Sequence, residues 1–290
     1  MMKDVMYFAP TEMSEALKLL DQYGEKATIL AGGTDLVPKI NYDDLKPDVL
    51  VYIGGLGLDY IKEGDGKLVI GAATPTAKIA ASELVARTAS ALADAARQSG
   101  AVTVRNAATI GGNLGNASPA ADLATALLAL DAQLLLRSSK GDRRVALKDF
   151  FMGPGRTVLK PGELIVEVSI PLSKGRAVFL KLGRRKAMTL SVVNVAVHLE
   201  MDGKRRWEKL ACQEARIALG SMAPTPLRCA KAEGLLRGKV LDKALIAQCA
   251  AEAVAESSPI DDQRATAWYR KIAGTVLVSR ALAQAAGIEL

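Results

Sequence analysis

The sequence predicts an α+β fold, and three observations support this. The first seventy residues alternate between helix-like spacing and short apolar runs typical of strands. Three strand-like runs lie between residues 177 and 222, and helix-like sequence rich in alanine and leucine follows them. The length of 290 residues is too great for one small core, so we expect one large domain or two to three modest domains. Strands followed by helices favour an antiparallel sheet with helices on one side in the C-terminal part.

Local spacing predicts the N-terminal elements. Thr11 is placed to cap a helix with apolar residues at helical spacing, and Gly24 is placed to end it. Residues 27–31 and 48–53 are short apolar runs typical of buried strands. The segment 60–74 contains Gly-Asp-Gly between two strand-like runs, which predicts a hairpin.

The middle of the chain alternates again between helices and strands. The alanine-rich residues 76–99 predict one helix. Pro119 is placed to start another helix, with Asp122 in its first turn. Residues 133–138 and 163–171 predict strands that a loop separates.

The segment 172–176 contains Gly and Lys and marks a candidate domain boundary. Beyond it, residues 177–185, 190–200 and 214–222 predict three strands, and the last part of the chain predicts helices. The C-terminal domain is therefore expected to hold a three-stranded antiparallel sheet covered by helices.

Composition and charge exclude several classes of protein. Half of the residues are hydrophobic, yet no run approaches the roughly 20 apolar residues of a membrane helix, and no signal peptide is visible, so we expect a cytoplasmic protein without a transmembrane segment. The three cysteines are far apart, which argues against a disulfide framework or a metal site. The net charge is +7, but aromatic residues make up only 4%, so we expect no nucleic-acid binding. We interpret the basic clusters at 140–144 and 204–206 as solvated turn charges.

Two glycine-bearing motifs are the main candidates for ligand binding. They read LAGGTDL (30–36) and TIGGNLGN (109–116), and both follow β-type residues. Their glycines lack side chains where backbone N–H groups could approach an anion. Neither matches GxGxxG or a phosphate loop with GK[ST]. One such motif more often indicates a tight turn, but two together indicate a long ligand that carries phosphates.

Polar side chains beside these glycines fit such a ligand. A carboxylate accepts hydrogen bonds from ribose or ribityl hydroxyls better than a neutral group does, and hydroxyl and amide groups can donate to a pyrophosphate. The candidate acceptors are Asp35 and Asp122, and the candidate donors are Thr34, Thr109, Asn113 and Asn116. An alternative for Asp122 is an acid that stabilises the first turn of its helix.

Few side chains could perform difficult chemistry alone. His198 is the sole histidine, and the alternating pattern of side chains around it indicates a strand residue whose ring nitrogens have hydrogen-bond partners. One histidine and no paired cysteines make a hydrolase triad or a histidine-rich metal centre hard to build, which points to a cofactor. Lys181 is expected on a strand before the basic residues 184–186, where it could stabilise a reduced cofactor. A solvated basic turn is the alternative for 185–186.

Five segments together resemble one known family. They are LAGGTDLVPKI, VRNAATIGGNLGNASPAADL, GELIVEVSIP, KLGRRKAMTLSVVNVAV and RIALGSMAPTPLRCAKAEGLLRG. They look like the FAD-binding medium subunit of the molybdenum hydroxylases, the group that contains xanthine dehydrogenase, aerobic carbon monoxide dehydrogenase and 4-hydroxybenzoyl-CoA reductase. The resemblance covers essentially the whole chain. This sequence lacks the inserted cysteine-bearing loop of 4-hydroxybenzoyl-CoA reductase.

The resemblance implies a fold and a set of FAD-binding residues. The fold is a vanillyl-alcohol-oxidase-type domain of two α/β subdomains (1–55 and 56–173), followed by a C-terminal α+β domain (174–290) with a three-stranded antiparallel sheet and helices. No catalytic side chain and no metal ligand is implied in this chain. The residues implied to bind FAD are Ile29, Leu30, Ala31, Gly32, Gly33, Thr34, Asp35 and Leu36, then Thr109, Ile110, Gly111, Gly112 and Asn113 at the pyrophosphate, Asp122 at the polyol, Ile165 and Lys181 at the isoalloxazine, and Gly100 and Asn116.

The resemblance also implies a function within a complex. The substrate would react at molybdopterin in a large partner subunit, and two [2Fe–2S] clusters in a small partner subunit would pass electrons to FAD in this chain. The external acceptor would be NAD, a quinone or a carrier protein, and the assembly a dimer of heterotrimers. Two alternatives stay open: a flavin oxidase that acts alone, and a non-redox nucleotide-binding or assembly protein.

Overall fold

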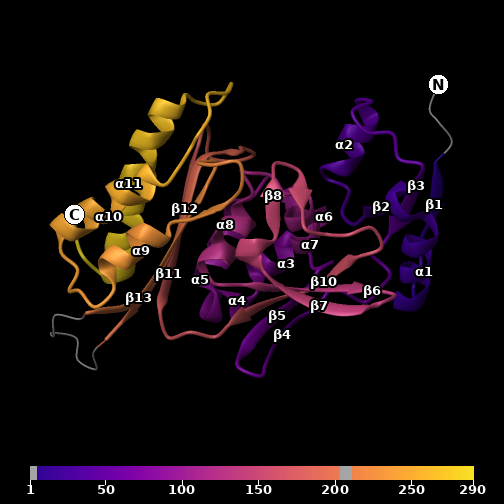
Figure 1. Cartoon of the computed structure of the whole chain (residues 1–290), viewed down its shortest axis with the longest axis horizontal. Coiled ribbons are helices and arrows are strands. Elements are labelled where there is room, and N and C mark those ends of the chain that lie inside the picture. Colours follow the sequence, from indigo (N-terminus) through magenta and orange to yellow (C-terminus); the bar gives the residue numbers. More distant parts are fainter. Residues whose placement is uncertain (1–4, 203–210) are drawn as a thin grey trace.

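The structure is a computed structural model that describes residues 5–202 and 211–290. It mixes helices and strands along its whole described length, as predicted. Figure 1 shows the N-terminal elements at one end of the molecule, a five-stranded sheet in the middle, and the C-terminal sheet with its helices at the opposite end. Of the helices in the described ranges, none combines the length and apolarity that crossing a membrane requires. The basic cluster 204–206 lies outside the described residues.

The N-terminal part is a small parallel sheet with a helix packed on it. The strands lie in the order β1-β3-β2. The elements are β1 (Met6–Phe8), α1 (Met13–Tyr23), β2 (Ala27–Leu30), α2 (Leu36–Asn41) and β3 (Val49–Tyr52). Gly24 ends α1 with a positive φ of 50°, as predicted. The residue before α1 is Glu12, and no side chain caps the helix, so the prediction of a Thr11 cap is wrong.

The middle sheet is antiparallel, with the strand order β4-β5-β10-β6-β7. Its strands are β4 (Ile61–Gly64), β5 (Lys67–Gly71), β6 (Gln133–Ser138), β7 (Gly141–Ala146) and β10 (Leu164–Pro171). The predicted hairpin turns at Asp65 and Gly66, which both have positive φ, as a tight two-residue turn requires. A short hairpin of β8 (Phe151–Gly153) and β9 (Arg156–Thr157) lies in the predicted loop before β10.

The helices between β5 and β6 are shorter than predicted. They are α3 (Thr76–Ala81), α4 (Glu83–Thr88), α5 (Ser90–Gln98), α6 (Val102–Ala107), α7 (Ile110–Gly115) and α8 (Asp122–Ala129). The single helix predicted over 76–99 is wrong because Ser82 leaves the helical conformation and its side chain accepts a hydrogen bond from the Val85 N–H group. Pro119 lies outside α8, whose first residue is Asp122. Every residue of α8 is buried, so this helix has neighbours on all sides.

The C-terminal sheet has four antiparallel strands, not the predicted three. They are β11 (Arg176–Gly183), β12 (Ser191–Met201), β13 (Cys212–Gly220) and β14 (Leu227–Arg228). The strand β14 was missed because two residues are too few for an alternating pattern. Figure 1 shows α9 (Ala230–Leu236), α10 (Lys243–Ala255) and α11 (Ala267–Ala286) on one face of this sheet and α5 and α8 on the other.

The C-terminal sheet is buried on both faces. Along β12, Val195 and Val197 belong to the apolar cluster under α9–α11, whereas Ala196 belongs to the cluster that also contains Leu123 and Leu127 of α8. The C-terminal sheet therefore contributes to the core of the middle region as well as to its own core. This arrangement explains why β12 reads as an almost continuous apolar run.

Candidate functional site

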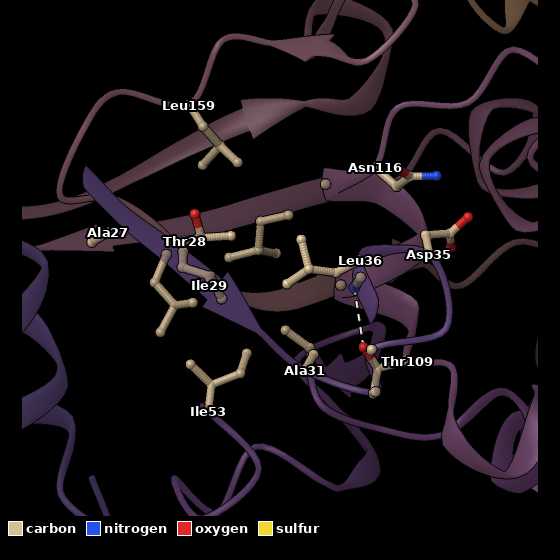
Figure 2. A pocket seen from close by; sticks show the side chains of 18 of the residues that line it. Ala27, Thr28, Ile29, Ala31, Asp35, Leu36, Ile53, Thr109, Asn116 and Leu159 are labelled. Carbon is tan, nitrogen blue, oxygen red and sulfur yellow. Dashed lines mark hydrogen bonds between the residues drawn. The ribbon is translucent and has the colours of Figure 1, made fainter. Parts of the chain in front are cut away.

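A cavity of about 760 Å³ lies where the two glycine motifs meet. Figure 2 shows side chains from several parts of the chain around it: β2 with the loop after it, Ile53 after β3, the two ends of α7, and the segment before β10. The predicted site residues that line it are Ile29, Ala31, Gly32, Gly33, Thr34, Asp35, Leu36, Thr109, Gly111, Gly112, Asn113, Asn116 and Ile165. The fold thus brings together most of the residues that the sequence analysis selected.

The first glycine segment (residues 29–36) turns sharply between β2 and α2. Gly33 has a φ of 69°, in the left-handed region that favours glycine. A Cβ atom on Gly32 would lie 1.8 Å from the backbone oxygen of Ala107, the last residue of α6. Glycine is therefore required at position 32 because the backbones of the first segment and of α6 are in direct contact.

The second glycine segment (residues 109–116) is mostly a helix, not the predicted turn. Thr109 caps α7, and its hydroxyl accepts a hydrogen bond from the Gly112 N–H group at 3.1 Å. The N–H groups of Ile110, Gly111 and Asn113 donate to backbone oxygens of the chain at 2.8–3.1 Å. These N–H groups therefore already have protein acceptors, so the polar groups that the segment leaves for a ligand are the side chains of Thr109, Asn113 and Asn116, which line the cavity.

The third wall of the cavity is the loop 159–164, which the sequence analysis missed. Its position is held by Arg143 on β7, whose Nε donates to Glu163 Oε1 at 2.6 Å and whose second guanidinium nitrogen donates to the Val158 oxygen at 2.8 Å. The hydrogen bonds from Arg143 lower the pKa of Glu163. The interpretation of 140–144 as solvated turn charges is therefore wrong for Arg143. The sequence carried no signal for this contact because the two residues lie on separate elements.

Five predicted site residues do not line the cavity. Ile110 is fully buried in the middle core, and Leu30 is the last residue of β2. Gly100 follows α5 with a φ of 55°. Asp122 and Lys181 lie apart from the cavity lining and bind each other.

Asp122 and Lys181 form a buried ion pair between α8 and β11. Lys181 Nζ lies 2.5 Å from Asp122 Oδ2, and their side chains are 5 and 6% exposed. Ser191 and Asn194 of β12 donate to Asp122 Oδ1 at 2.6 and 2.8 Å. Burial raises the pKa of Asp122, and the Lys181 ammonium group opposes this shift. The predicted strand position of Lys181 is confirmed.

The basic residues after Lys181 border a second hollow of about 370 Å³. Arg184 donates to the backbone oxygen of Gln263 at 3.1 Å, and Arg185 Nε donates to the oxygens of Ala187 and Met188 at 3.1 and 2.9 Å. Both arginines are exposed: Arg184 links the segment to the distant Gln263, whereas the hydrogen bonds of Arg185 stay within its own turn, as in a solvated basic turn.

His198 lies on β12 as predicted, but only one of its two ring nitrogens has a hydrogen-bond partner among the described residues. Its Nε2 atom is hydrogen-bonded to the Ser173 hydroxyl, whereas Nδ1 has no partner among the described residues. Burial lowers the pKa of His198 to about 4, so the ring is neutral at pH 7.

The chain matches two known families along most of its length. Residues 2–173 match the family described as the FAD binding domain in molybdopterin dehydrogenase. Residues 178–285 match the CO dehydrogenase flavoprotein C-terminal domain. The chain belongs to the FAD-binding medium subunits of the molybdenum hydroxylases.

Named relatives of this medium subunit are similar over nearly their full length. It is 32% identical to the carbon monoxide dehydrogenase medium chain of Hydrogenophaga pseudoflava, with 95% of both chains covered. It is 31% identical to the glyceraldehyde dehydrogenase medium chain of Sulfolobus acidocaldarius, with 97% of this chain and 98% of the relative covered. A solved structure of reconstituted CO dehydrogenase from Oligotropha carboxidovorans superposes with a TM-score of 0.93 at 31% identity and full coverage of both chains.

The cavity of this medium subunit fits the chemistry of FAD. The Oδ1 atom of Asn113 is buried and has no hydrogen-bond partner in the described part of the chain, which leaves an acceptor for a ligand donor. Ala31, Gly32 and Gly33 line the cavity with little or no side chain, so their backbone borders it. Apolar residues, among them Ile53 and Ile165, line other parts of the same wall. An elongated ligand with a polar and an apolar end therefore matches this lining.

Proposed function

We propose that the chain binds FAD in the 760 Å³ cavity and transfers electrons from [2Fe–2S] clusters of a partner subunit to an external acceptor such as NAD or a quinone. The convergence of the two glycine segments and Ile165 on one cavity carries the proposal. When bound, FAD supplies the redox chemistry, and the chain supplies binding and orientation.

The proposed roles of the cavity residues follow from their chemistry. The first glycine segment binds the pyrophosphate through its accessible backbone. Thr109, Asn113 and Asn116 donate hydrogen bonds from their side chains, and Asp35 accepts them from hydroxyl groups. Ile165 packs against the isoalloxazine ring.

Asp122 and Lys181 are proposed to reach the polyol and the ring of FAD, and Gly100 to lie near them. Asp122 Oδ1 accepts hydrogen bonds from two donors on β12, and Oδ2 accepts one from Lys181, which also donates to the Gln98 oxygen. The Asp122 carboxylate can accept a further hydrogen bond and the Lys181 ammonium group can donate one, so FAD can bind there while the ion pair stays intact. Both buried charges then keep their partners, which burial requires.

The proposal extends to the complex. The partners are a large molybdopterin-binding subunit and a small subunit with two [2Fe–2S] clusters, assembled as a dimer of heterotrimers in the cytoplasm. Relatives named medium chain or FAD subunit of a dehydrogenase support this assignment. Within the chain we propose a division at 1–55, 56–173 and 174–290, supported by the three separate sheets β1-β3-β2, β4-β5-β10-β6-β7 and β11-β12-β13-β14, one in each range.

Reconstitution tests the proposal. The purified chain is incubated with FAD, unbound cofactor is removed, and the visible spectrum is recorded. Retained flavin absorbance with a defined stoichiometry is expected, and its absence refutes the assignment. Co-expression with the two partner subunits should give a complex in which substrate reduces the flavin. If the chain alone turns over a substrate with oxygen, the electron-transfer role is wrong and an independent oxidase is favoured.

A further inference from the structure

Lys39 joins the two glycine segments across the cavity wall. It lies on α2, directly after the first segment, and its Nζ atom donates to Oδ1 of Asn116 in the second segment at 3.0 Å. Both residues line the cavity. The side chain of Lys39 therefore reaches the polar groups that are proposed to bind the pyrophosphate.

The backbone of Lys39 is anchored, although its side chain is exposed. Its carbonyl oxygen accepts hydrogen bonds from the N–H groups of Asp44 at 2.9 Å and Leu45 at 3.1 Å. The ammonium group therefore starts from a fixed point, and it can change its hydrogen-bond acceptor without movement of α2.

The charges that line the cavity leave few groups to neutralise a pyrophosphate. The acidic residues are Glu25, Asp35, Asp44 and Glu163, and the basic residues are Lys39 and Lys160. Arg143 neutralises Glu163, but acids still outnumber bases in the lining. A dianionic pyrophosphate therefore needs a cation from the chain.

Position favours Lys39 over Lys160 as this cation. Lys160 follows Leu159 on the third wall, where its backbone N–H group donates to Glu163 Oε2 at 2.8 Å. Figure 2 shows Leu159 well apart from Asn116 and Asp35. Because Lys39 is bonded to Asn116, it lies at the end of the cavity that the glycine segments form.

We propose that Lys39 binds the pyrophosphate of FAD, exchanging its hydrogen bond with Asn116 for one with a phosphate oxygen. The inference rests on the proposed function, since it assigns one residue within the FAD site. A charge-assisted bond between ammonium and phosphate is stronger than the neutral amide contact that it replaces. Lys39 thus adds to the binding site a positive charge that neither glycine motif contains.

Titration of FAD into the apo chain at several salt concentrations tests this role. Lys39→Gln is expected to weaken FAD binding about ten-fold at low salt and to reduce the salt dependence of Kd, because one screened charge pair is lost. Lys39→Arg is expected to restore both properties. Lys18→Gln is the matched control, because Lys18 is exposed on α1 outside the cavity lining, and it should bind FAD like the wild type at every salt concentration. Lys160→Gln removes the other lysine of the lining and should have the smaller effect of the two lining variants.

The outcomes separate the two proposals. If the wild-type chain binds no FAD, the proposed function fails. If the wild type binds FAD and Lys39→Gln has the same Kd and salt dependence, the role of Lys39 is overturned while FAD binding stands. A loss that is equal at all salt concentrations and is not restored by arginine overturns it too, because it indicates a structural effect. A larger loss in Lys160→Gln than in Lys39→Gln would assign the charge to Lys160 instead.

Discussion

Replacement of Gly32 by alanine tests the direct contact between the first glycine segment and α6. The new Cβ atom would lie 1.8 Å from the Ala107 oxygen and 2.5 Å from its carbonyl carbon. The obstacle is backbone, which cannot turn away as a side chain can. Hydrogen bonds also hold this stretch, since Ala108 N–H donates to the Val104 oxygen at 2.7 Å.

The size of the effect follows from the displacement. Ordinary contacts begin near 3.4 Å, so the two backbones must separate by about 1.6 Å. Overpacking of this kind costs about 1–3 kcal/mol of unfolding free energy. Because the separation also widens the cavity wall, Kd for FAD is expected to rise about ten-fold for each 1.4 kcal/mol of lost binding energy.

Urea unfolding and FAD titration measure the two effects in Gly32→Ala. The control is Gly234→Ala, because Gly234 lies in α9 with open space at the Cβ position. The control should gain about 0.5–1 kcal/mol from better helix propensity and bind FAD normally. Wild-type stability and FAD affinity in Gly32→Ala would show that the two segments are not in contact as described.

Three further predictions concern ionisable side chains. Although burial opposes it, hydrogen bonds from two backbone N–H groups and from Arg270 lower the pKa of Asp262 to about 2. In urea titrations, Asp262→Asn should therefore lower the unfolding free energy by about 2 kcal/mol at neutral pH, and this difference should vanish as the pH falls from 4 to 2. Burial lowers the pKa of His198 to about 4, so acid protonates this ring more readily in the unfolded chain than in the folded one. In the same titrations, the unfolding free energy of the wild type should therefore fall by about 3 kcal/mol from pH 7 to 4, and His198→Gln should lack most of this fall. Asp122→Ala should lower the unfolding free energy by about 3–5 kcal/mol, because it leaves Lys181 unpaired. The double variant Asp122→Ala/Lys181→Met should recover part of this loss. If the loss in the double variant equals the sum of the losses in the two single variants, the pairing is contradicted.

The elements that the sequence predicted well are those with strong local patterns. The hairpin at Asp65 and Gly66 and the strand that carries Lys181 follow from turn residues and alternating side chains. The break at Ser82 was hidden because alanine favours helix on both sides of it. A serine three residues before Val85 was the available signal, since it caps α4.

The sequence predicted the parts of the candidate site that carry a recognisable motif, which are the two glycine segments. The two glycine segments meet at the cavity because Gly32 packs directly against Ala107, two residues before the second segment. The loop 159–164 has no ligand-binding motif, and its place depends on the contact between Arg143 and Glu163, which are 20 residues apart. Contacts of this kind depend on the tertiary fold, so sequence spacing does not reveal them.

The shared core between α8 and the C-terminal sheet limits how the molecule can move. Ala196 on β12 and Ala218 on β13 pack in one apolar cluster with Leu123 and Leu127 of α8, and the Asp122–Lys181 ion pair lies at the same junction. A hinge motion between these parts would expose that apolar surface and separate two buried charges. Entry and exit of a ligand at the cavity should therefore depend on local movement of the loops around it, while α8 and the C-terminal sheet stay fixed relative to each other.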